Sequence, residues 1–62
     1  MNNERTITIA RRIAAAVDRL DSIVRSQAIF LTAMGYIPER SKRNERMTRT
    51  RIELLCHALT NA

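Results

Sequence analysis

The sequence predicts an all-α fold: a helical hairpin with a long helix over about residues 10–34, a turn at Gly35–Pro38 and a second helix over about residues 51–61. Three observations predict it. Apolar residues recur every three or four positions along the first half, a glycine and a proline interrupt that pattern, and a second amphipathic stripe follows near the C-terminus. With 62 residues, the chain forms a single domain (residues 1–62) at the small end of the range in which one core stabilises a monomer.

The long helix is predicted by a heptad pattern. Its positions are separated alternately by four and three residues, which places them on one face of a helix. They are Ile9, Ile13, Ala16, Leu20, Ile23, Gln27, Phe30, Met34 and Ile37. Val17, Val24 and Leu31 each follow one of these positions and widen the stripe to that of a bundle helix. Gly35 suits the position after a helix because it adopts positive φ easily, and Pro38 follows as a stop signal.

The start of the long helix stays open. Residues 5–9 alternate polar and β-branched side chains, a pattern typical of a short strand. A lone strand has no partner within this chain, so a frayed first turn of helix or disorder is favoured for residues 1–8.

The second helix has two alternative starts. Thr50 and Glu53 have the spacing of a capping box, in which each side chain accepts a hydrogen bond from the backbone amide of the other residue. This pattern opens a helical stripe that consists of Ile52, Leu55, Cys56 and Leu59. The residues from Glu39 to Arg49 are also good helix formers, so Pro38 at a first helical position would start the helix much earlier.

Residue counts exclude several kinds of function. The chain has one cysteine and one histidine, the neighbours Cys56 and His57, which leaves no internal disulfide and no ligand set for a structural metal. Two helices also offer little concave space for a nucleophile and its base. We therefore expect no enzymatic activity, no catalytic, metal-binding or cofactor-binding residues, no cofactor and no small-molecule substrate.

The N-terminal sequence and the hydropathy bear on localisation. Residues 1–12 lack the basic and continuous apolar regions of a signal peptide. The longest uncharged stretch, Ser26–Pro38, has 13 residues, fewer than the roughly 20 that span a bilayer. We expect a cytoplasmic protein without membrane contact.

The end of the long helix predicts association. Residues 28–34 are apolar nearly all the way round, whereas residues 39–46, which would face them in a hairpin, contain no apolar side chain. Because such a helix end needs cover on more than one side, we expect a homodimer, built as a four-helix bundle, or a partner protein. The expected interface residues are Leu20, Ile23, Gln27, Phe30, Leu31, Met34, Tyr36 and Ile37.

A basic segment carries the clearest functional signal. The net charge is +5, and ten of the eleven basic residues are arginines. Six of the eleven fall within 12 residues, namely Arg40, Lys42, Arg43, Arg46, Arg49 and Arg51. Arginine forks match phosphate oxygens, and a helix start near residues 48–51 would add free amides, so we expect contact with nucleic acid or with an acidic host-protein surface. Arg11, Arg12, Arg19 and Arg25 are interpreted as a solvated face.

Two resemblances suggest biological settings. The strand-like residues 5–9, the helix after them and the stretch from Met47 to Ile52 before a final helix resemble ribbon-helix-helix repressors. The resemblance implies a ribbon of Arg5, Thr6 and Thr8 in the major groove and a phosphate clamp at residues 48–50. That family joins its helices by a short turn containing glycine, unlike the long connection here.

In size and composition, the chain also resembles small arginine-rich accessory proteins of temperate bacteriophages. This resemblance implies a regulatory protein that binds nucleic acid or, as the alternative, a homo-oligomeric adaptor or inhibitor that binds a host protein. In the alternative, the apolar end of the long helix docks on the target and the arginines form a charged rim.

Overall fold

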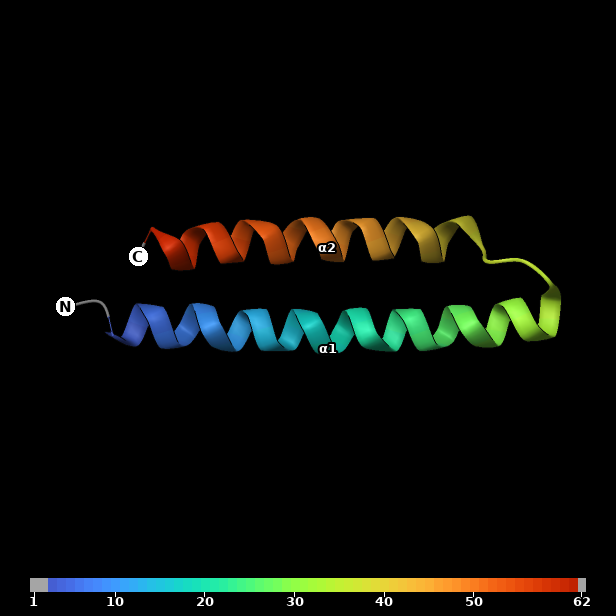
Figure 1. The fold of residues 1–62 in the computed structure, drawn as a ribbon, viewed down its shortest axis with the longest axis horizontal. Coiled ribbons are helices and arrows are strands. Elements are labelled where there is room, and N and C mark those ends of the chain that lie inside the picture. Colours follow the sequence, from blue (N-terminus) through green and yellow to red (C-terminus); the bar gives the residue numbers. More distant parts are fainter. Residues whose placement is uncertain (1–2, 62) are drawn as a thin grey trace.

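The computed structural model describes residues 3–61, which form two antiparallel α-helices lying side by side (Figure 1). Helix α1 spans Asn3–Met34 and helix α2 spans Glu39–Thr60. The Cα trace measures 51 × 14 × 12 Å. The expected all-α hairpin is therefore confirmed. Neither helix has a stretch that is long and apolar enough to cross a membrane.

Helix α1 begins at Asn3, seven residues before the expected start at residue 10. Residues 5–9 are helical, so the alternative of a strand is wrong, and the ribbon implied by the resemblance to repressors is absent from this segment. Ile9 is buried, and packing of this kind outweighs the weak strand preference of the threonines and isoleucines. Glu4 in the first turn also suits the positive end of the helix dipole.

The turn confirms the role expected of Gly35. Its φ is +81°, and its backbone amide donates a hydrogen bond of 3.0 Å to the carbonyl oxygen of Leu31. This is the left-handed conformation that closes helices after their last turn. Helix α1 extends past the start of α2 at this end, so its last turns have no helix beside them (Figure 1).

Helix α2 takes the earlier of its two expected starts. It begins at Glu39, and the carbonyl oxygen of Pro38 accepts hydrogen bonds from the amides of Ser41 and Lys42 at 3.0 and 3.2 Å. The start at residue 51 is wrong, because Thr50 and Glu53 lie in the middle of the helix, where their amides already have helical partners. The free amides expected near residues 48–51 are therefore absent.

The two helices meet along one line, which we call the seam. On α1 the seam follows the heptad pattern: every position expected from Ile9 to Phe30 is buried or half-buried, and only Met34, beyond the start of α2, is exposed. On α2 the buried or half-buried side chains repeat with the same spacing. They are Ser41, Glu45, Thr48, Ile52, Leu55 and Leu59, and Asn44 and Ala58 beside them are half-buried as well.

The seam has a polar half and an apolar half. Near the turn, α2 offers Ser41, Glu45 and Thr48, whereas near the free ends it offers only apolar side chains. Among residues 3–61 no side chain is completely buried, and the buried apolar residues are Ile9 and Ala16. A single hairpin therefore has a small core that is concentrated away from its turn.

The conformation of Gly35 yields a stability prediction. A Cβ atom at this position would meet no heavy atom within 4 Å, so replacement costs only the strain of positive φ. We expect Gly35→Ala to lower the free energy of unfolding by about 1 kcal/mol. Gly35→Asn should cost less, because asparagine tolerates this conformation. Urea denaturation at one fixed protein concentration measures both, and equal stability of all three proteins would contradict the assignment.

Candidate functional site: an arginine groove between the helices

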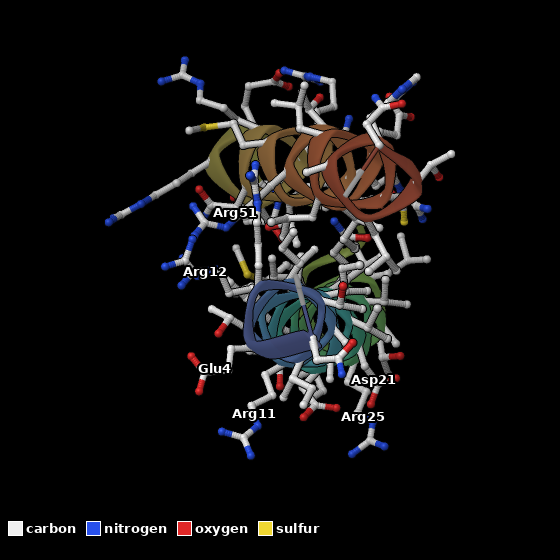
Figure 2. All side chains as sticks on the ribbon, turned by 90° about the vertical axis from the view of Figure 1, so that its left-hand side faces the viewer. Glu4, Arg11, Arg12, Asp21, Arg25 and Arg51 are labelled. Carbon is white, nitrogen blue, oxygen red and sulfur yellow. The ribbon has the colours of Figure 1, made fainter. Side chains whose placement is uncertain are left out.

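A groove runs along one side of the seam, and four arginines line it. Two adjoining hollows of about 660 and 360 Å³ share Arg19 and Asn44. The first also contains Arg12 and Arg51, and the second contains Arg40. We call the combined surface the arginine groove. Arg12 and Arg51 come from different helices and lie on the same side of the hairpin (Figure 2).

The groove is positive because it contains no carboxylate. Its other polar lining residues are neutral and are Ser22, Ser26, Ser41, Asn44 and Thr48. Ion pairs among residues 3–61 join Arg25 to Asp21, Arg46 to Glu39 and Arg49 to Glu45, and none involves a groove arginine. The four guanidinium groups therefore keep their hydrogen-bond donors available for an anion.

The structure divides the basic segment that the sequence singled out. Of its six residues, Arg40 and Arg51 line the groove. Arg46 lies 3.5 Å from a carboxylate oxygen of Glu39, and Arg49 lies 2.8 Å from one of Glu45. Arg43 is two residues, about 200° around the helix, from Ser41 in the seam, so it faces away from α1. Lys42 also lies outside the groove lining.

Sequence reasoning missed Arg12 and Arg19, which it interpreted as part of a solvated face. The structure brings both to Arg40 and Arg51 in one groove. The signal was present in the spacing. Arg12 and Arg19 are seven residues apart, and Arg40 and Arg51 are eleven apart, so each pair occupies one side of its helix.

One polar contact sets the register of the two helices beneath the groove. The amide nitrogen Nε2 of Gln27 donates a hydrogen bond of 2.9 Å to Oε1 of Glu45 and lies 3.5 Å from the carbonyl oxygen of Ser41. The other carboxylate oxygen of Glu45 accepts a 2.8 Å hydrogen bond from Nε of Arg49. A polar residue in a helical seam restricts the register of the helices, and here its partners lie within the same chain.

The same contact alters the acidity of Glu45. The hydrogen bond from the Gln27 amide, followed by that from Arg49, lowers the pKa of the Glu45 carboxyl below its ordinary value, against a smaller opposing effect of partial burial. The carboxylate is thus charged at neutral pH. It holds Arg49 on its own helix, outside the groove lining.

The clamp expected at residues 48–50 does not form. Thr48 is buried, and its hydroxyl donates a 2.8 Å hydrogen bond to the carbonyl oxygen of Asn44 one turn earlier. Its hydroxyl hydrogen is thereby committed to its own helix, and no helix begins there to supply free amides.

The eight expected interface residues fall into two groups. Most of them lie buried or half-buried within the single hairpin, namely Leu20, Ile23, Gln27, Phe30 and Ile37. Leu31, Met34 and Tyr36 are exposed. The surface of one chain that is left for a partner is therefore narrower than the sequence suggested.

Residues 3–61 bring no three histidine, cysteine or acidic side chains together at a distance that would hold a metal ion. Cys56, which the sequence places in the apolar stripe of the second helix, is exposed and forms no disulfide.

Comparisons with known proteins add no homologue to this description. The chain matches no protein-family model, no curated protein and no solved structure. The arginine groove must therefore be interpreted from its own geometry and charge.

The Gln27–Glu45 contact predicts an acid-sensitive hairpin. Because folding lowers the pKa of Glu45, the unfolded chain binds the proton more readily than the folded one. This contribution to stability is present above the ordinary pKa of 4.5 and is lost as the pH falls below it. Urea denaturation between pH 7 and pH 3 should show the loss, and Glu45→Gln should reduce it. The matched variant Glu53→Gln should retain the wild-type dependence; an identical dependence in both variants would refute the assignment.

Proposed function

We propose that this protein is a non-enzymatic regulatory or accessory protein that binds nucleic acid through the arginine groove, by contact with phosphates. The observation that carries the proposal is the convergence of four arginines from two helices on one groove whose lining has no carboxylate. A surface that only keeps a protein in solution needs no such convergence. Arginine forks bind phosphate oxygens in pairs, which gives both attraction and orientation.

The dimensions of the groove suit an extended polyanion better than a single ion. At about 1.5 Å per residue, Arg12 and Arg19 are separated by roughly 10 Å along α1, and Arg40 and Arg51 by roughly 16 Å along α2. One small anion cannot reach all four side chains at once. A duplex, with one charge per roughly 1.7 Å of its axis, offers phosphates along this whole length.

The neutral lining supports backbone contact. Ser22, Ser26 and Asn44 supply hydroxyl and amide groups between the arginines, and such groups commonly contact phosphate and sugar oxygens. Contacts of this kind position a protein on nucleic acid and carry no sequence information. The proposed binding is therefore independent of base sequence.

We also propose that the binding form is a homodimer. The support is the exposure of Leu31, Met34 and Tyr36 near the turn, where α1 extends past α2. Covering apolar side chains of this size stabilises a complex by roughly 1.5–3 kcal/mol each when they are fully buried, which is large for so small a chain.

Binding to duplex DNA across a salt series tests the proposed function. Four phosphate contacts per groove should make log K fall with log salt at a slope of about −3.6. The double variant Arg12→Gln/Arg51→Gln should bring that slope to about half. The control Arg11→Gln/Arg43→Gln removes the same charge from one residue of each helix outside the groove, and it should change the slope much less.

Two outcomes would overturn the proposal. Equal slopes for the two double variants would show that total charge, and not the groove, governs binding. No binding at about 50 mM salt would exclude nucleic acid and leave an acidic protein surface as the ligand of the arginines.

A further inference from the structure

The hairpin exposes more surface than a compact monomer of its mass. Its accessible surface is 5077 Å², whereas a compact 7.1 kDa protein exposes roughly 4,100 Å². The difference, on the order of 1,000 Å², is close to the roughly 800 Å² that each partner buries in a standard interface. The elongated hairpin therefore has enough surface for one interface of standard size.

Part of this surface is an apolar stripe on α1, made of Val17, Val24 and Leu31. Their exposed fractions are 47%, 43% and 53%. They are spaced seven residues apart, so they form one line along the helix beside the seam. A second helix packs against such a line in the way that α2 packs against the seam.

The apolar stripe lies away from the arginine groove. Asp21 is four residues after Val17 and three before Val24, so the three side chains are neighbours on one flank of α1. In Figure 2, Asp21 and Arg25 point away from the side on which Arg12 and Arg51 lie. Covering the stripe would therefore leave the groove open.

We infer that the apolar stripe is the contact surface for a second copy of this chain, with α1 packed antiparallel against α1 of the partner subunit around Val24. The inference rests on the proposed homodimer and is independent of the proposed binding of nucleic acid. An isologous interface of this kind uses the same patch on both subunits. Val17 then lies opposite Leu31 of the partner subunit, so the stripe covers itself along its whole length.

Charge complementarity favours a second copy as the occupant. Asp21, which forms a 2.9 Å ion pair with Arg25, borders the stripe close to its centre. In the antiparallel arrangement, Arg25 approaches Asp21 of the partner subunit and the two ion pairs become a network of four charges. The same patch thus supplies both signs of charge in the order that self-pairing requires.

The flank of α2 beside the apolar stripe is charged. Lys42 and Arg49 are seven residues apart on one flank of α2, and Arg49 is about 180° around the helix from the groove residue Arg40. They therefore lie on the same side of the hairpin as the apolar stripe. Arg49 is paired with Glu45 at 2.8 Å, so Lys42 remains as a cation on this flank. The apolar stripe itself belongs to α1, so the contact is centred on α1 and differs from the four-helix bundle that the sequence suggested.

Sedimentation equilibrium at micromolar concentrations tests this inference. The wild-type protein should have twice the mass of the chain. Val24→Glu places a carboxylate opposite its own copy and beside Asp21, so the dimer dissociation constant should rise at least tenfold. The control Ala33→Glu lies on another face of α1 and should leave the dimer dissociation constant within about twofold of the wild-type value. A folded wild-type monomer would overturn the dimer and the inference together; an unchanged constant in Val24→Glu would overturn the inference alone.

A cross-linking measurement tests the same contact without requiring that the Val24→Glu variant remain folded. In a Cys56→Ser background, Val24→Cys places a thiol beside its own copy on the symmetry axis, and a short bis-maleimide should join the two subunits in high yield. Ala33→Cys in the same background should give little cross-linked product. Equal yields at the two positions would overturn the inference. Neither measurement involves DNA, so failure here is distinct from failure of the proposed function.

Discussion

Two packed helices share a single line of contact, and every other feature of this protein depends on how that line is filled. The seam is apolar toward the free ends and polar toward the turn, where Gln27 and Glu45 meet at 2.9 Å. A polar contact in a seam contributes less stability than an apolar one but permits fewer alternative registers. The hairpin thus has a defined alignment and a small core.

The alignment of the seam positions the functional surfaces. Once Gln27 lies against Ser41 and Glu45, the arginines on the adjoining flanks of both helices fall on one side, and the apolar stripe with Val24 falls on the other. A shift of one turn along the seam would move the α2 arginines about 5 Å relative to those of α1. The buried amide of Gln27 and the half-buried carboxylate of Glu45 therefore contribute to the geometry of a site that they do not line.

The sequence predicted the helices from their apolar periodicity and the turn from its glycine and proline, because these signals are local. The heptad spacing identified the buried face of α1 down to Gln27, and Gly35 marked its end. The start of α2 was ambiguous because Thr50 and Glu53 satisfy the pattern of a cap within a segment that is helical on both sides. Local pattern cannot tell a cap from a mid-helix threonine. The early start of α2 is favoured by contacts in the seam, where Thr48 and Glu45 pack against α1 although neither is apolar.

The groove was only half predictable for a related reason. The density of arginines along the chain predicted a binding surface at residues 40–51. The groove also contains Arg12 and Arg19, which come from a distant part of the sequence. Density along a chain measures proximity in sequence, and a helix distributes neighbours around its axis. Arg46 and Arg49 were further removed by Glu39 and Glu45, whose pairing depends on the register and rotamers of the folded helix.

The uneven seam also bears on the order of events in folding. In most hairpins the residues nearest the turn meet first, because the loop that they close is short. Here those residues are polar, and the apolar contacts that reward closure join Ile9 to the end of α2, about fifty residues away along the chain. During folding, the chain therefore loses most of its loop-closure entropy before most of its apolar surface is buried. The docking of one helix on the other is therefore favoured chiefly by residues at the two ends of the chain and less by those at its turn.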